Sequence, residues 1–490
     1  MDNKISRRKM IRSVSGITLG AGISTLPLNG AFYPAHTGEK SKTLPRGINV
    51  KVSPPGPNSL ALLEEVDKYV GRSNLAGLFG VGLKSGEGSY IEDLDGNVYI
   101  DCLTSASSTL LGYSRDDIAK AYYDSSLEIQ QTCFPYTLNS EALEFAKKFS
   151  RIAPGDHSKK VLMGVSGSDS VCGAIEAARK YTGRMRVTSF KFAYHGSTGL
   201  SQAASGFRSL NEGIYDMNDK DFVRVPFPVT PQESERVLKN IESILAFGKT
   251  AAVLVEIIQG DGGKLVPPEG FYSRLREILD KYGVLLIADE IQSGMGRTGK
   301  WWASDHEGIV PDITVAGKGL SAGYAPVSAI VGRKEVLDAL VPAAHVFTYT
   351  GHGPSVTAAS KTIDIIENEN LIENSRETGG YLLNGLKEAE KYEDVVVEAR
   401  GRGFMIGIEI DVSRNPLASR VFAFRCLEKG VYFGYIGDKQ QVIRVLPPMN
   451  ISREECDHVI RVVHETAEEM HYDRVPGETI EKVERFAVGW

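Results

Sequence analysis

The chain has 490 residues, of which 42% are hydrophobic, and a formal net charge of −6 at pH 7. This length can hold two or three domains with ample material for a core, and the acidic balance argues against nucleic acid as a partner. The five cysteines show no C-x-x-C spacing and the histidines show no helical H-E-x-x-H spacing, so neither a disulfide framework nor a metal site is expected.

The N-terminal segment is basic and then mildly apolar. Ser6-Arg-Arg-Lys-Met-Ile-Arg12 precedes a stretch from Ser13 to Pro27 that is too short, and too rich in glycine and serine, to span a bilayer stably. The pattern resembles a twin-arginine signal over residues 1–35, followed by a linker over residues 36–58. It predicts a periplasmic or otherwise exported protein. If the arginines belong to an ordinary basic tail, the protein is cytoplasmic.

Short apolar runs alternate with helical stretches, such as 235–246 and 271–282, through the middle of the chain. The runs cover residues 161–165, 187–190, 252–257, 284–288, 313–316 and 328–331. This alternation predicts an α/β domain with a mostly parallel sheet covered on both faces. Ligands of such sheets bind beyond the carboxyl ends of the strands, where Asp261, Asp289 and Lys318 would all fall.

A turn of small residues, Ser166-Gly-Ser-Asp-Ser170, separates the first run from a helical stretch. Backbone amides at that helix start would face an anion; Gly167 allows close approach and Ser168 adds a hydroxyl donor. Such a turn can also serve only as a helix cap. After the next run, Tyr194 could stack on a flat heteroaromatic ring, although Tyr194 and His195 can equally be ordinary core or loop residues.

Two charged residues that follow buried runs suit an aldehyde cofactor. Lys318 lies among small and apolar neighbours, so its pKa should fall and its amine can condense with a carbonyl as a Schiff base. Asp289 can hold a pyridine nitrogen protonated. A solvated loop lysine and a helix-capping aspartate are the plainer interpretations of each residue alone. Together they indicate pyridoxal phosphate.

The C-terminal part begins a second group of elements. Gly401 to Ile410 predicts the first main strands of a smaller domain. Two helices are expected after it, from Pro416 to Lys429 with Asn415 as the cap, and from Glu454 to Met470.

Seven short motifs occur in the order typical of class-III pyridoxal-phosphate aminotransferases, and the chain resembles that family from about Gly80 to its end. The motifs are Ser166-Gly-Ser, Tyr194-His-Gly, Gln259-Gly-Asp-Gly-Gly263, Asp289-Glu-Ile-Gln292 with Gly296-Arg-Thr-Gly299, Ala316-Gly-Lys-Gly319, Phe347-Thr-Tyr-Thr-Gly351 and Ile443-Arg-Val-Leu-Pro-Pro448. The resemblance implies a fold-type-I enzyme, with a large cofactor-binding domain over residues 105–346. Its smaller α+β domain would be built from residues 59–104 and 347–490.

The resemblance also implies how the cofactor is held. Lys318 would be the Schiff-base lysine, Asp289 the pyridinium partner, and Tyr194 the side chain against the ring face. Gln292 would lie near the ring hydroxyl, and the Gly167-Ser168 turn would hold the phosphate.

Two further roles follow from the resemblance. Thr348 would reach the phosphate of the neighbouring subunit, which implies a homodimer. Arg444 would grip the α-carboxylate of a small-molecule amino acid substrate through two hydrogen bonds.

The family contains two reactions that need different numbers of bases. In an aminotransferase, Lys318 removes the α-proton and returns it to the cofactor carbon on the same face, whereas a racemase must deliver a proton to the opposite face of the α-carbon. Asp261 is a candidate second base, and the isoleucine 2-epimerase and caprolactam racemase members look similar in this loop. Its plainer interpretation is an aspartate that stabilises a glycine turn.

Export favours racemisation, because a 2-oxo-acid co-substrate would be scarce outside the cytoplasm. The sequence therefore favours an amino-acid racemase or epimerase that uses Lys318 and Asp261, with a class-III aminotransferase as the alternative.

A different class of protein, a dinucleotide-dependent oxidoreductase, is suggested by one motif. The segment Gly294-Met-Gly-Arg-Thr-Gly299 matches the dinucleotide-binding fingerprint. That fingerprint should open a helix directly from a strand, but five residues, Asp289 to Ser293, intervene here. An oxidoreductase is therefore disfavoured. A non-catalytic binding protein on the same fold is disfavoured by Lys318.

Overall fold

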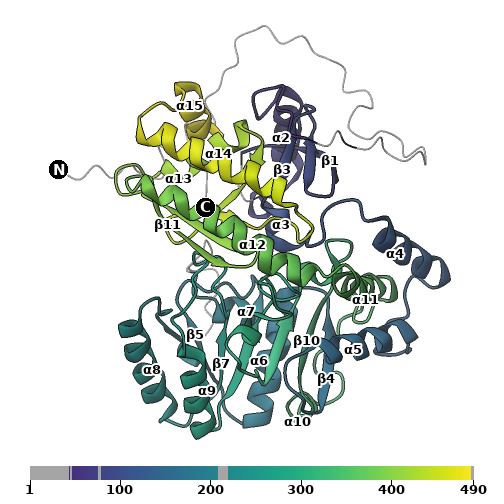
Figure 1. Cartoon of the computed structure of the whole chain (residues 1–490). Coiled ribbons are helices and arrows are strands. Elements are labelled where there is room, and N and C mark those ends of the chain that lie inside the picture. The colour runs from purple at the N-terminus through teal and green to yellow at the C-terminus, as the bar shows by residue number, and fades with distance from the viewer. Residues whose placement is uncertain (1–43, 45–46, 76–78, 208–218, 487–490) are drawn as a thin grey trace. The chain divides into compact units, whose positions relative to one another are not determined.

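The computed structural model describes residue 44 and residues 47–75, 79–207 and 219–486 (Figure 1). These residues belong to one compact unit, Leu44–Trp490. The predicted export signal lies outside the described residues and the predicted linker lies partly outside them. Both stay predictions, as do the predicted domain boundaries. Within the described ranges, no helix is long and apolar enough to cross a membrane.

A seven-stranded mixed sheet forms the larger layer of the fold, with the order β4-β10-β9-β8-β7-β5-β6. Its strands are β4 (Lys159–Gly164), β5 (Arg186–Phe190), β6 (Phe222–Val225), β7 (Thr250–Val255), β8 (Leu285–Asp289), β9 (Ile313–Ala316) and β10 (Ser328–Arg333). Only β10 runs antiparallel to its neighbours among the paired strands of this sheet. The predicted mostly parallel sheet is confirmed. The sequence analysis did not identify β6, because this four-residue edge strand is too short to show a run.

Helices cover both faces of this sheet. Alternate residues of β7 point to opposite sides, since Val253 and Val255 pack in one apolar cluster and Ala252 and Leu254 in another. The first cluster includes residues of α8 (Pro231–Leu245) and α9 (Phe271–Tyr282), and the second includes residues of α6 (Gly167–Thr182).

The start of α8 differs from the prediction. The helix begins at Pro231 rather than at residue 235. Thr230 accepts a hydrogen bond from the Glu233 amide, and the Glu233 carboxylate accepts one from the Thr230 amide. This capping box, with proline at the first helical position, fixes the earlier start.

Two smaller sheets bring the N-terminal and C-terminal parts of the chain together, as the predicted fold class requires. One has the order β1-β2-β3-β13, and β13 pairs with β3 in parallel. The other has the order β11-β12-β15-β14 and is antiparallel. The strands are β1 (Leu83–Glu87), β2 (Tyr90–Asp93), β3 (Val98–Asp101), β11 (Val396–Arg402), β12 (Met405–Ile410), β13 (Val431–Tyr432), β14 (Gly434–Ile436) and β15 (Val442–Val445).

The segment from Gly401 to Ile410, predicted to begin the main strands of the smaller domain, forms parts of two strands. It contains the end of β11, a turn at Gly403, where φ is 54°, and then β12. The glycine supplies the left-handed conformation that lets the two strands pair.

The remaining helices surround these sheets (Figure 1). They are α2 (Pro57–Tyr69), α3 (Thr104–Ser107), α4 (Asp116–Glu128), α5 (Ser140–Ile152), α7 (Gly199–Ala204), α10 (Lys334–Leu337), α11 (Gly353–Asn368), α12 (Leu371–Lys387), α13 (Ala418–Glu428), α14 (Arg453–His471) and α15 (Gly477–Phe486). Short 3-10 turns are η1 (Arg72–Asn74), η2 (Asp219–Asp221), η3 (Ala303–His306), η4 (Lys318–Ser321) and η5 (Glu388–Lys391).

The two helices predicted near the C-terminus are present as α13 and α14, but the predicted cap of the first is wrong. The Asn415 side chain accepts a hydrogen bond from the Leu417 amide, 2.9 Å away, in a turn before the helix. Leu417 is the N-cap residue of α13. In α14, Ser452 and Glu455 form a capping box.

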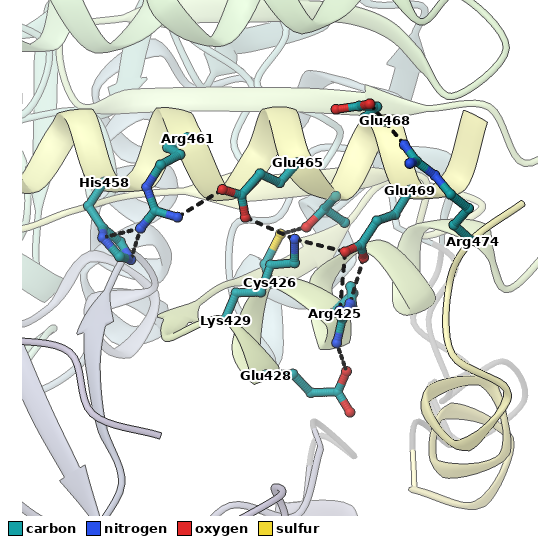
Figure 2. Close-up of polar contacts among 11 residues, drawn as sticks. Arg425, Cys426, Glu428, Lys429, His458, Arg461, Glu465, Glu468, Glu469 and Arg474 are labelled. Atoms are coloured by element: carbon teal, nitrogen blue, oxygen red, sulfur yellow. Dashed lines mark hydrogen bonds and ion pairs between the residues drawn. The ribbon is translucent and has the colours of Figure 1, made fainter. Parts of the chain in front are cut away.

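A ladder of ion pairs joins α13 to α14 (Figure 2). Arg425 contacts Glu469 at 2.7 Å, and Lys429 contacts Glu465 at 3.0 Å and Glu469 at 3.1 Å. The Arg425 and Glu469 side chains are 20% and 22% exposed, so water screens this pair less than a fully exposed pair.

Removing the partly buried ion pair between Arg425 and Glu469 should lower the free energy of unfolding. Arg425→Met should reduce the free energy of unfolding by about 1 kcal/mol, because Glu469 loses a half-buried partner. Arg461→Met is the matched control on α14, since its pair with Glu465 is 53% and 42% exposed and should contribute much less. Urea unfolding of the two variants beside the unsubstituted protein measures the difference. Equal losses in both variants would contradict the effect of burial.

Candidate active site

The predicted site residues converge beyond the carboxyl ends of β7, β8 and β9, in a cavity of about 180 Å³. Its lining consists of Gly167, Ser168, Tyr194, His195, Gly196, Glu256, Asp261, Asp289, Ile291, Gln292 and Lys318. Every predicted site residue is among them except Arg444 and Thr348. A larger hollow of about 350 Å³ between α4, α5 and α11 shares none of these residues, and its lining mixes Glu141, Lys148 and Asp364.

Lys318 lies directly after β9, as the first residue of η4. Its φ of 40° is in the left-handed region, which costs energy for a residue with a Cβ. Burial lowers the pKa of Lys318, and Arg444 lowers it further, while Asp261 and Glu256 oppose the shift. The direction agrees with the loss of solvation expected from the sequence.

Asp289 ends β8 and is held by a buried histidine. Its Oδ2 lies 2.8 Å from His195 Nδ1, and its Oδ1 accepts a hydrogen bond from the Ile291 amide at 3.1 Å. The His195 side chain is fully buried, and its Nε2 has no hydrogen-bond partner among the described residues. No local sequence pattern assigns this role to His195, because its partner lies 94 positions away in the chain.

Glu256, which follows β7, is a second buried acid that the sequence analysis did not find. Its carboxylate accepts hydrogen bonds from the Tyr194 amide at 2.9 Å and the Gly260 amide at 2.8 Å. Burial raises the pKa of Glu256 to about 7; Asp289 also raises it and His195 opposes the shift. Its position at the end of an apolar run in the sequence was the signal that could have identified Glu256 as a site residue.

The start of α6 combines a helix cap with an open turn. Ser166 and Asp169 form the capping box, so the capping interpretation holds for Ser166. Gly167 and Ser168 line the cavity. A Cβ at residue 196 would lie 2.5 Å from the Ser168 Oγ, so Gly196 leaves this hydroxyl its space. The small residues keep the helix start open to an anion.

Asp261 and Arg444 form an ion pair at the edge of the cavity. Arg444, on β15, places Nη2 2.8 Å from the Asp261 Oδ1. Burial raises the pKa of Asp261, but the nearby charges of Arg444, Lys318 and Lys264 outweigh it and the pKa is lowered. Arg444 does not itself line the cavity, but it contacts Asp261, which does. Its Nε is buried and without a hydrogen-bond partner in the described part of the chain.

Thr348 lies away from the cavity in the single chain. Its carbonyl oxygen accepts a hydrogen bond from Gln131 Nε2 at 2.9 Å. Large exposed side chains surround this stretch of sequence, with Tyr349 59% exposed and Tyr136 85% exposed.

The lining fits pyridoxal phosphate. Lys318 would supply the amine, the Asp289 carboxylate held by His195 would be the partner of a ring nitrogen, and the Gly167-Ser168 turn would offer a helix start to the phosphate. A Cβ at residue 167 would lie 2.8 Å from Ile291 Cδ1, so glycine keeps this cradle open.

Comparison with known proteins agrees with this fit. The class-III aminotransferase family model matches residues 74–466. The chain is 33% identical to an alanine/serine racemase from Pyrococcus horikoshii, over 90% of this chain and 95% of that protein. It is 34% identical to an isoleucine 2-epimerase from Lentilactobacillus buchneri, over 85% of this chain and 97% of that protein. Other relatives are named acetylornithine, 5-aminovalerate and ornithine aminotransferases.

The fold is shared with solved transaminase structures. A transaminase from the marine bacterium Virgibacillus superposes with a TM-score of 0.78 at 26% identity, over 84% of this chain and 99% of that chain.

The raised pKa of Glu256 predicts a pH-dependent stability in the cofactor-free protein. Between about pH 4.5 and 7 the folded state binds more protons at this group than the unfolded state, so stability falls as pH rises through this window. Glu256→Gln removes this titrating group. Across the pH window, the free energy of unfolding of the unsubstituted protein should therefore fall by roughly 3 kcal/mol more than that of the variant. Urea unfolding at both pH limits measures the change. Exposed Glu269→Gln is the control, and the same pH dependence in all three proteins would show that burial does not shift Glu256.

Proposed function

The chain belongs to the class-III aminotransferase family of pyridoxal-phosphate-dependent enzymes, and we propose that it racemises or epimerises an amino acid at its α-carbon. The observation that carries the proposal is Asp261, a second group able to transfer a proton in the cavity that holds Lys318. Inversion needs one such group for each face of the α-carbon, whereas transfer of the amino group needs one base. Similarity to a racemase and an epimerase over most of the chain supports the proposal.

The two groups are suited to opposite steps. The bound cofactor withdraws electrons from the α-carbon and so acidifies its hydrogen. The lowered pKa of Lys318 makes its free amine available to accept that hydrogen from one face. The lowered pKa of Asp261 makes it a carboxylate that accepts a proton from the other face. For either enantiomer, one group removes the proton and the other, in its protonated form, returns one.

Arg444 links substrate binding to the second base. Its guanidinium has five N–H donors, and the contact with Asp261 involves Nη2, so further donors can hold the substrate carboxylate. The same side chain holds Asp261 at 2.8 Å. Occupation of Arg444 by a substrate carboxylate would therefore affect the position and the charge of Asp261 together.

The ion pair also favours the alternative function, an aminotransferase that passes the amino group to a 2-oxo acid. A carboxylate stabilised by Arg444 is a weaker base, because its lowered pKa reduces the driving force for accepting a proton. In an aminotransferase, Asp261 would only be the ion-pair partner of Arg444 in the absence of substrate, and the substrate carboxylate would replace it. The relatives named as aminotransferases support this alternative.

A homodimer is part of the proposal. Thr348 does not line the cavity of its own chain, and exposed apolar side chains gather in the neighbouring segments. They include Tyr136 (85% exposed), Leu138 (81%), Phe347 (37%) and Tyr349 (59%). Exposed apolar surface of this kind is typical of an interface, and a second copy would cover it while bringing Thr348 to the partner's cavity.

The purified enzyme should invert single L-amino acids in heavy water without any added 2-oxo acid. Chiral chromatography with mass detection should find the D-enantiomer carrying deuterium at the α-carbon. Asp261→Asn should lower inversion by about a hundredfold or more while the protein keeps its cofactor, because one of two proton-transfer groups is lost. Asp438→Asn, an exposed aspartate in a nearby loop, is the control.

Amino-group transfer that requires a 2-oxo acid, with no D-enantiomer formed, would establish the aminotransferase alternative. Unchanged inversion in Asp261→Asn would refute the two-base proposal.

Mixed dimers test the role of Thr348. Lys318→Ala and Thr348→Asp should each inactivate a pure dimer, the second because a carboxylate repels the cofactor phosphate. Co-expression of the two chains with different tags should restore activity, since one site of the mixed dimer then has both intact residues. The mixed dimer of wild type and a chain carrying both substitutions, isolated through its two tags, has no intact site and should be inactive. An inactive Lys318→Ala/Thr348→Asp mixed dimer, activity in the wild-type/double-mutant mixed dimer, or a monomer in sedimentation would contradict the shared site.

A further inference from the structure

Lys264 is a second lysine at this site, and the mechanism above does not use it. We propose that Lys264 is a positioning residue: its amine holds the Gln292 side-chain amide in one orientation, and that amide in turn holds Asp261. The inference deepens the proposed function, because it treats Asp261 as the second proton-transfer group.

The hydrogen bonds of Gln292 define this role. Lys264 is fully buried, and its Nζ donates a hydrogen bond to the Gln292 Oε1. The Gln292 side chain lines the same cavity as Asp261 and helps to lower the pKa of that carboxylate. Because a carboxylate only accepts, the amide must turn its NH2 group to Asp261 and its oxygen to Lys264. Without the lysine donor, the amide oxygen would lose the contact that fixes this orientation.

The backbone conformation of Lys264 and the burial of its amine are both energetically unfavourable. Its φ of 55° is in the left-handed region, which a residue with a Cβ adopts reluctantly. Burial lowers the pKa of Lys264 well below its ordinary value, Arg444 lowers it further, and Asp261 opposes the shift. A buried amine in a strained backbone is retained when its surroundings require it.

The fold makes room for this side chain. A Cβ at residue 407 of β12 would lie 2.9 Å from the Lys264 Cβ and 3.0 Å from its Cγ, so Gly407 leaves space for the stem.

The loop itself does not need the amine. Gln259 and Leu265 exchange backbone hydrogen bonds of 2.9 and 3.1 Å, and the Lys264 amide donates to the Gly260 carbonyl at 3.2 Å. These bonds involve only main-chain atoms, so an apolar side chain at residue 264 would preserve them. The amine is therefore explained by its contact with Gln292 rather than by the loop.

The test compares Lys264→Met, which keeps an unbranched stem one atom shorter and removes the donor, with Lys264→Gln, which keeps a neutral donor. Lys239→Met, at an exposed position on α8, is the matched control. The first readout is the visible absorption spectrum of the holoenzyme across pH, because Gln292 lines the cofactor cavity. The second is the ratio of inversion to α-hydrogen exchange in heavy water.

Lys264→Met should keep the cofactor, shift its absorption band or the pH at which that band changes, and lower the inversion-to-exchange ratio by about tenfold to a hundredfold. Lys264→Gln should stay near wild type. Since both residues act through one amide, Lys264→Met should add little to the effect of Gln292→Leu in a double-mutant cycle.

An unaltered spectrum and ratio in Lys264→Met, or equal defects in Lys264→Gln and Lys264→Met, would overturn the positioning role. If Lys264→Met does not fold, Lys264→Gln decides alone: near-wild-type spectra support the role, and shifted spectra reject it. Failure of the proposed function is distinguishable. It would appear as wild-type enzyme that forms no D-enantiomer, while the spectral comparison and its cycle with Gln292→Leu still test the contact between Lys264 and Gln292.

Discussion

Loss of solvation around charged side chains is the constraint on which this site depends. Burial is the main cause of the lowered pKa of Lys318 and Lys264 and of the raised pKa of Glu256. Each buried charge is tolerated because an opposite charge or a donor lies near it, as Arg444 does for Asp261. The cavity therefore holds groups whose protonation is set by their neighbours, which is the condition for acid-base chemistry near neutral pH.

The parallel sheet determines which side chains share this environment. Glu256 follows β7, Asp289 ends β8 and Lys318 follows β9, and these three strands are adjacent. Adjacent parallel strands deliver their carboxyl ends to one edge of the sheet, so residues distant in sequence meet there. β15 of the smaller antiparallel sheet adds Arg444 to this edge, and Gly437 fixes the Asp261 loop by donating its amide to the Asp261 carbonyl at 3.0 Å. The substrate-facing side of the site thus depends on both sheets.

Sequence reasoning located the residues that follow strands or begin a helix, because apolar runs and small-residue turns are local patterns. It could not find the contact of His195 with Asp289 or that of Lys264 with Gln292, since these depend on the three-dimensional approach of separate loops. Local signals also misplaced details of the fold. Asn415 forms a turn before α13 instead of its cap, and α8 begins at Pro231 instead of residue 235, because the capping box at Thr230 decides where that helix starts.

The similarity of this chain to both racemases and aminotransferases has a chemical explanation. Both reactions need an amine at the cofactor aldehyde, a partner for the ring nitrogen and an anion site, and the residues for these functions lie in one cavity. The reactions differ in whether a second group can exchange a proton with the α-carbon. Under the proposed function that difference depends on Asp261, whose carboxylate pairs with Arg444 at 2.8 Å and whose pKa is lowered mainly by Arg444 and Lys318. A carboxylate paired with a guanidinium is oriented well but is weakly basic. The proposed inversion therefore requires that a substrate carboxylate at Arg444 weaken this pair before Asp261 accepts a proton, whereas the alternative amino-group transfer makes no such demand.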